Sequence, residues 1–378
     1  IEILGTNAEI ELRFNGEISE HPMTISRKKL TIRAADGYRP TILFTPTEDE
    51  LVQYSQNMFT LMESDILIRG VDLTFDVPKD VAADRWSFFE LRGDDRLQFE
   101  GCDITLRNAA KSSAGNWQTY HQETAFFRIR PGVEHGTSIM STPGKNTRFV
   151  DITLRDALVR GEGVILRNQS SWNVSWTVRN SVLISTEPAV LVSGVDVLLP
   201  AADVKTPSMR IDFNKVTASV GSSFCSYVIS EFSPWFLPAD FNITDSILRL
   251  DGGSLIVHSG LDSVADAKLN LLWTGNNNFY EGMIDAWYIR TKGLDVNDGE
   301  HMSLDAWNEL WGINPQIDRV GWLQLPDGSL PVSQFTRDSF KLNASSGNPA
   351  LESKAGYQPP TAVEVSPTGT TPSPDMEN

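Results

Sequence analysis

Arginines recur at one position in three successive apolar segments of the sequence. Arg92, Arg130 and Arg167 each end a short apolar segment. If these segments are β-strands, side chains alternate between the two faces, and the three arginines point outward. Strands stacked about 4.8 Å apart would make their guanidinium groups repel one another unless solvent, Glu90 or a bound anion screens them. Continued through the later segments, the predicted outward row consists of Arg92, Arg130, Arg167, Ser193, Ser230, His258 and Arg290.

Two interpretations of this row stay open. In the first, it is a solvated face with splayed guanidinium groups. In the second, it binds an acidic or sulfated glycan, because the guanidinium fork pairs with carboxylate or sulfate in a bidentate way.

Aromatic residues near Arg167 could extend such a site. Trp172 and Trp176 follow it in the sequence; an exposed indole can stack on a sugar ring, whereas a buried one fills the core. A polar insertion over residues 108–123 carries His121 and interrupts the spacing of the apolar segments. Loops on a rigid scaffold often carry function, so we interpret the insertion either as part of the binding site, through His121, or as a flap over an apolar edge.

A vicinal acid pair, Asp94 and Asp95, comes shortly after Arg92. Paired carboxylates act as general acid and base in many enzymes that hydrolyse polysaccharides. Asp is also common in tight turns, where its side chain bonds to nearby backbone. The catalytic interpretation of this region assigns the chemistry to Asp94, Asp95 and Arg130, and the structural interpretation assigns both acids to a turn.

Motifs for metal binding and nucleophilic catalysis do not occur in the sequence. HExxH, GxSxG and P-loop patterns are missing, although each would carry a defined chemistry. The histidines show no ligand spacing and are His21, His121, His135, His258 and His301. We therefore expect neither a metal nor a cofactor.

Charge and composition narrow the possible partners. The 378 residues include 32 basic and 49 acidic ones, a net charge of −17. Such a chain repels nucleic acid and anionic membranes unless a local patch overrides the overall field, so no nucleic-acid partner is expected. The sequence starts at Ile1 rather than Met, and no apolar run approaches the roughly 20 residues of a membrane span. We expect a mature form or an excised domain, with membrane attachment only through a segment upstream. Cys102 and Cys225 have no metal or redox spacing, which predicts two buried thiols.

Three series of short apolar segments alternate along the chain. The first begins near residues 58, 88, 126, 163, 189, 227, 255 and 287, and the second near residues 66, 97, 147, 174, 209, 240 and 269. The third is shorter and follows an Asp or Asn at residues 72, 103, 151, 180, 214, 245 and 277. Strands this thin bury a face only by stacking, so the pattern predicts an all-β fold, a right-handed parallel β-helix of about nine to ten three-strand coils.

Other all-β folds fit less well. Jelly rolls and propellers need many two-residue Asn-Gly or Asp-Gly turns, and such turns are scarce here. One helix is predicted over residues 302–311, capped by Ser303, and is expected to lid the last coil. The expected organisation is a β-helix over residues 1–300, a C-terminal cap over residues 301–358 and a disordered tail, rich in Pro, Thr and Ser, over residues 359–378.

Two stretches resemble a known family. Residues 30–42 (LTIRAADGYRPTI) resemble the first coil of the pectin-lyase-like right-handed parallel β-helix superfamily. Residues 338–342 (DSFKL), with residues 348–350 (NPA) and 355–356 (AG), are similar to its closing segment. The resemblance covers roughly residues 1–358 and implies a fold rather than an activity, because the superfamily includes lyases, hydrolases, epimerases, adhesins and binding domains.

The resemblance also frames the functional expectations. A lyase of this superfamily would remove a proton beside a uronate carboxylate with Lys or Arg, helped by Ca²⁺ on clustered carboxylates. The Gly-His-Gly and Arg-Ile-Lys signatures of its pectin-degrading hydrolases do not occur here. This opening and closing also look like the extracytoplasmic C-terminal regions of some bacterial receptor-type Ser/Thr protein kinases, which implies an extracytoplasmic location and a kinase domain upstream.

The sequence therefore supports two alternative functions. The first is a non-catalytic module that binds a polysaccharide or protein ligand through Arg92, Arg130, Arg167, Trp172, Trp176 and His121. The second is a polysaccharide lyase or glycoside hydrolase acting on an acidic polysaccharide.

Overall fold

The computed structural model describes most of the chain. The described residues are 5–47, 56–81, 85–130, 148–194, 208–229, 237–261, 263–293, 298–313, 320–323, 325–326, 328–344 and 347–359.

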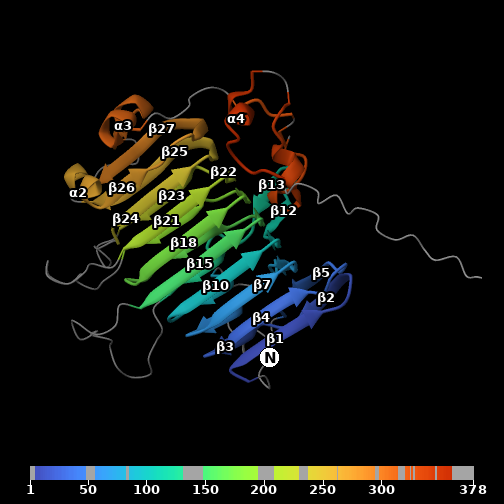
Figure 1. Cartoon of the computed structure of the whole chain (residues 1–378). Coiled ribbons are helices and arrows are strands. Elements are labelled where there is room, and N and C mark those ends of the chain that lie inside the picture. Colours follow the sequence, from blue (N-terminus) through green and yellow to red (C-terminus); the bar gives the residue numbers. More distant parts are fainter. Residues whose placement is uncertain are drawn as a thin grey trace, which may run out of the picture.

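Parallel β-sheets run the length of the molecule (Figure 1). Sheet A contains, in spatial order, β1 (Asn7–Leu12), β4 (Lys29–Ala34), β7 (Asp65–Arg69), β10 (Asp95–Glu100), β15 (Phe149–Arg155), β18 (Asn173–Arg179), β21 (Met209–Asn214), β24 (Ala239–Thr244) and β26 (Leu271–Thr274).

A second sheet consists of two rows of strands that continue into each other at one end. Row B1 contains β2 (Gly16–Glu20), β5 (Pro40–Phe44), β8 (Asp72–Asp76), β11 (Asp103–Arg107), β16 (Leu158–Gly161), β19 (Val182–Ser185), β22 (Thr217–Val220) and the first parts of β25 (Ile247–Leu261) and β27 (Phe279–Thr291). Row B2 contains β3 (Met23–Ser26), β6 (Asn57–Met62), β9 (Ser87–Leu91), β14 (Ala125–Ile129), β17 (Val164–Asn168), β20 (Val190–Ser193), β23 (Ser223–Val228) and the last parts of β25 and β27.

Each strand pairs with its equivalent one repeat later. In sheet A, β15 and β18 pair in parallel, with Ile152 beside Trp176. The chain passes from sheet A to row B1, then to row B2, and back to sheet A. The prediction of an all-β fold built mostly of parallel strands is confirmed, and the arrangement is compatible with a parallel β-helix.

Left-handed backbone marks the corner between sheet A and row B1. Asp156, Asn180, Lys215, Asp245 and Asn277 have φ between 45° and 57° there. Asn and Asp tolerate this conformation because their side chains bond locally. Asn277 Nδ2 donates to Asp245 Oδ1 at 2.7 Å, and Asn180 Nδ2 donates to Asp156 Oδ1 at 2.6 Å, so the corner side chains also link successive repeats.

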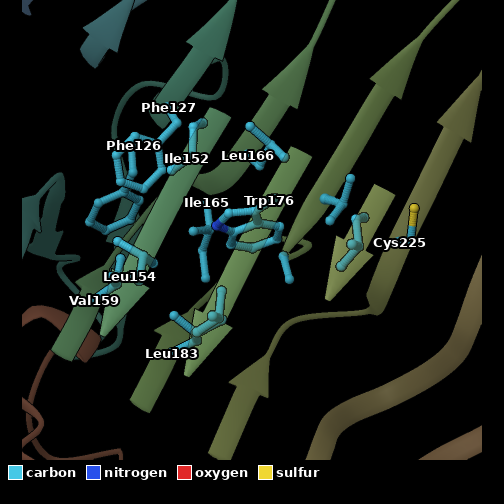
Figure 2. Close-up of a cluster of buried hydrophobic side chains, with 14 of the residues drawn as sticks. Phe126, Phe127, Ile152, Leu154, Val159, Ile165, Leu166, Trp176, Leu183 and Cys225 are labelled. Carbon is cyan, nitrogen blue, oxygen red and sulfur yellow. The ribbon is translucent and has the colours of Figure 1, made fainter. Parts of the chain in front are cut away.

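The core lies between the sheets and is filled by large apolar side chains. Figure 2 shows Phe126 and Ile165 of row B2, Ile152 and Trp176 of sheet A, and Val159 of row B1 gathered in one cluster, and each is fully buried. Both cysteines are buried and free, as predicted. Burial raises the pKa of the Cys102 thiol to about 11, so this thiol is protonated at neutral pH.

The C-terminal end of the core is covered by helix α3 (Leu304–Trp311) and by a short antiparallel strand, β28 (Glu300–Met302). Ser303 is the N-cap and accepts a hydrogen bond from the Ala306 amide, as predicted. Trp307 is buried against Trp273 and Trp287, with ring centroids 5.3 and 5.6 Å away. A second helix, α2 (Val264–Leu269), lies at the same end.

The described part of residues 320–359, which we call the C-terminal strap, follows the side of the molecule instead. The strap includes η1 (Val332–Gln334), η2 (Arg337–Phe340) and α4 (Pro349–Glu352). It packs on the outer side of row B1, where Phe340 contacts an apolar patch made by Leu158, Val182 and Ile184. The predicted cap over residues 301–358 thus has two parts with different positions. Residues 360–378 of the predicted tail lie outside the described residues.

A buried carboxylate fixes the strap. Glu162 is nearly inaccessible to solvent and accepts hydrogen bonds from the amides of Asn108 at 3.0 Å and Ser333 at 2.9 Å. In the part of the chain that the structure describes, no helix has the length and apolar character of a membrane span.

Candidate functional site

The outer side of row B2 carries two rows of side chains in which arginines are neighbours. In the first row, Arg128 pairs with Glu90 of β9 and with Arg167 of β17. The second row places Arg130 beside Arg92, because the Arg130 amide donates to Leu91 O at 3.1 Å. We call this surface, with Glu123 at its edge, the arginine face; it consists of Glu90, Arg92, Glu123, Arg128, Arg130 and Arg167.

The predicted single row of three arginines is corrected by this register. Gln169, not Arg167, follows Arg130, since the Gln169 amide donates to Ile129 O at 3.0 Å. Arg167 belongs to the neighbouring row, beside Arg128. A shift of two residues leaves a side chain on the same face of a strand, so Arg167 still lies on the outer side.

Further along, the predicted row is correct in some places and wrong in others. Ser193 and Arg290 do lie in the row of Arg130, which continues through Val228 and Ser259. His258 is fully buried and stacks on Tyr227, so it points into the core rather than outward. Ser230 lies outside the described residues.

Glu90 is the centre of the ion pairs on this face. Its carboxylate is 1% exposed and pairs with Arg92 through Oε1, and Arg130 Nη1 lies 3.7 Å from its Oε2. Glu123 forms the second centre and pairs with Arg85 at 3.2 Å and with Arg167 at 3.7 Å. Screening by Glu90 was one of the expected ways to hold the arginines together.

Arg128 is the most unusual member. Its side chain is buried, with 1% of the residue exposed, and its guanidinium donates to the carbonyl oxygens of Arg85 (3.2 Å), Trp86 (3.1 Å) and Glu123 (2.5 Å). It forms no ion pair with a described residue. Burial first, and then the nearby Arg167 charge, lower the pKa of Arg128 to about 10, so the side chain still carries its charge at neutral pH.

Donor capacity is left over on this surface. Among the described residues, the Nε atoms of Arg128 and Arg167 are buried and have no hydrogen-bond acceptor. Burial lowers the pKa of Arg167 as well, against the opposing effect of Glu123. Of Arg92, Arg130 and Arg167, Arg130 is the most accessible, with 43% of its side chain exposed, and Arg167 is the least accessible, at 12%. Four arginines against two glutamates leave an excess of positive charge in a protein that is acidic overall.

Two residues of the predicted binding set are buried. Trp176 is in the core, packed edge to face on Phe213 at 5.0 Å, and cannot stack on a ligand. His121 is buried at the base of the insertion, where its Nε2 lies 2.8 Å from Pro78 O. Both therefore leave the candidate site because ligand cannot reach them. Trp172 is partly exposed, with the Arg148 guanidinium 5.5 Å from its ring centroid.

The insertion itself folds back on the molecule. It forms an antiparallel hairpin of β12 (Ala109–Lys111) and β13 (Trp117–Thr119). Trp117 Nε1 donates to Ser329 O of the strap at 3.2 Å. The hairpin thus contacts the strap.

The acid pair has a structural task at the turn after Arg92. Asp95 is buried and accepts hydrogen bonds from the amides of Ser64 (3.0 Å), Arg92 (3.0 Å) and Gly93 (2.9 Å). Burial raises the pKa of Asp95, and these hydrogen bonds oppose the rise. Asp94 is exposed, and its Oδ1 accepts from the Phe149 amide at 2.8 Å. This geometry favours the interpretation of Asp95 as a turn residue.

Within the described ranges, no three His, Cys, Asp or Glu side chains come together as a metal site would require. Arg128 is missing from the predicted binding set, although the alternation of side chains along its strand places it outward, level with Glu90.

Comparison of the chain with protein-family models, with curated proteins and with solved structures gives no match in any of the three searches.

Proposed function

We propose that the chain is a right-handed parallel β-helix module that lies outside the cytoplasm of a bacterium and binds an acidic or sulfated polysaccharide on its arginine face. The observation that carries this proposal is the excess of guanidinium groups there, of which Arg130 and Arg92 are accessible, with 43% and 33% of their side chains exposed. Sulfate or carboxylate oxygens can accept charge-assisted hydrogen bonds from these exposed guanidinium groups.

The geometry suits a repeating polyanion. Adjacent strands lie about 4.8 Å apart, so Arg92 and Arg130 present two forks along one line, with Arg167 beside them. Arginine stays charged and binds planar or tetrahedral anions through paired N–H groups. The acidic remainder of the protein would disfavour contact with polyanions elsewhere.

The residues favour ligand binding over catalysis. Asp95, the buried acid of the predicted catalytic pair, already has three amide donors. A catalytic acid or base needs its carboxyl group free to exchange a proton with substrate. A lyase or hydrolase acting with Asp94, Asp95 and Arg130, and using Ca²⁺ if it is a lyase, is the alternative. A role as the sensor region of a receptor-type Ser/Thr kinase is part of the same proposal.

The test is a binding titration with dextran sulfate at low and high salt. Wild type should bind, and binding should weaken as salt screens the charges. Arg130→Ala should lower affinity about ten- to hundredfold, because a hydrogen bond to a charged group contributes about 1.5–3 kcal/mol. Arg179→Ala is the matched control, since Arg179 is exposed on sheet A.

Outcomes of this test separate the alternatives. Equal affinity of the Arg130 and Arg179 variants, or no binding by wild type to any sulfated or uronate polysaccharide, would refute the proposal. Appearance of unsaturated products or new reducing ends with uronate polysaccharides, abolished by Arg130→Ala, would replace it with the enzyme alternative.

A further inference from the structure

A pocket of about 470 Å³ opens at the corner where the strands of row B2 turn into sheet A. The residues of its wall come from five successive repeats and include Asn7, Lys29, Asp65, Asp94, Arg96 and Phe149. The turn from Arg92 to Asp95 connects this pocket directly to the arginine face, and the Asp95 carboxylate holds that turn in place.

The charges of the wall are already matched. Arg27 Nε lies 2.9 Å from Glu63 Oε2, and Lys29 Nζ lies 3.8 Å from Asp65 Oδ2. Arg96 Nη1 lies 3.9 Å from the same Asp65 oxygen. A charged ligand would have to compete with these pairs. Hydroxyl groups act as donor and acceptor together, so a ring with several hydroxyls can bond to both members of a pair.

An exposed aromatic ring completes the wall. Phe149 is 39% exposed. Phenylalanine side chains are usually buried. Its amide is fixed by Asp94 Oδ1 at 2.8 Å, which holds the backbone at the mouth of the pocket. An apolar ring beside paired charges offers the C–H face of a sugar a packing surface and its hydroxyls their partners.

We infer that the corner pocket binds an uncharged sugar unit of the same polysaccharide whose anionic groups bind the arginine face. This inference rests on the proposed function and adds a second contact to it. The arginine face supplies charge recognition, and the pocket supplies recognition of the sugar ring.

The experiment uses the full chain and an array of defined oligosaccharides, some sulfated and some uncharged. Phe149→Ala should weaken binding to the best sulfated oligosaccharide at least about fivefold, as expected for loss of an aromatic contact, and leave its salt dependence unchanged. Arg130→Ala should instead reduce the salt dependence. Leu269→Ala is the control, because Leu269 is 82% exposed on α2, away from the pocket.

A second variant guards against misfolding. Arg27→Ala removes a polar part of the wall, and its side chain is 78% exposed, so its loss should not disturb the core. It should weaken binding in the same direction as Phe149→Ala, with circular dichroism unchanged. The inference about the pocket is overturned, and the proposed function kept, if only Arg130→Ala weakens binding. Both are overturned if wild type binds no oligosaccharide on the array.

Discussion

His258 links the placement of one side chain to a measurable pH dependence. The ring is fully buried, stacks on Tyr227 with centroids 4.2 Å apart, and accepts a hydrogen bond from Trp287 Nε1 to its Nδ1 at 2.9 Å. Burial lowers the pKa of His258 from 6.5 to about 3. The folded protein therefore holds a neutral imidazole where the unfolded chain would take up a proton.

The sign and size of the effect follow from this difference. The folded pKa of His258 is depressed. The contribution of neutral His258 to the unfolding free energy is therefore fully present above pH 6.5 and is lost as the pH falls toward about 3. A full unit of pH in that window corresponds to about 1.4 kcal/mol for one proton. Between pH 6.5 and 5.0, His258 should thus cost the protein about 1.5–2 kcal/mol of unfolding free energy.

The assay compares wild type with His258→Phe by urea unfolding at both pH values. Phenylalanine keeps a ring against Tyr227 but cannot titrate. Loss of the acceptor for Trp287 Nε1 should cost about 1–3 kcal/mol at both pH values, and all other titrating groups cancel in the difference between the two proteins. Wild type should lose about 1.5–2 kcal/mol more than the variant on acidification. Equal losses would show that His258 is not buried and that the register of row B2 is wrong.

Two further predictions test the strap and the stacking of repeats. Glu162→Ala leaves two buried amides without an acceptor and should lower the unfolding free energy by about 2–5 kcal/mol, whereas exposed Glu17→Ala should change it by less than about 0.5 kcal/mol in the same denaturation experiment. Gly253→Ala would place a Cβ atom 1.7 Å from Ser222 O of the preceding repeat. We therefore expect the midpoint of thermal unfolding to fall by at least about 5 °C. An unchanged midpoint would mean that the two repeats are not in such close contact.

The sequence predicted the order of strands well because the apolar segments and their turn residues repeat. Asn180, Asp245 and Asn277 were expected at bends, and each adopts left-handed backbone. Asp151 was also expected at a bend, but it lies within β15, and Asp156 forms the bend instead. The register was harder to predict. Every residue of the segment from Gly163 to Leu166 can face the core. The segment itself therefore does not show whether Val164 or Leu166 pairs with Phe127. The structure pairs Phe127 with Leu166.

Local sequence patterns could not show which outward side chains are covered by segments far away in the sequence. Leu158 and Ile184 lie on the outer side of row B1, where a lone sheet would carry polar residues. They are buried because Phe340 and other apolar residues of the strap, more than 130 residues later, pack on them. Burial of Trp176 and His121 likewise depends on contacts with distant segments, so the sequence left their roles open.

The most direct test of the proposed arginine face is a crystal structure of the protein with a sulfated oligosaccharide bound. We expect sulfate oxygens within hydrogen-bond distance of the Arg92, Arg130 and Arg167 guanidinium groups. A ligand bound only to sheet A or to the strap, with those three arginines still in contact only with protein and solvent, would contradict the proposal.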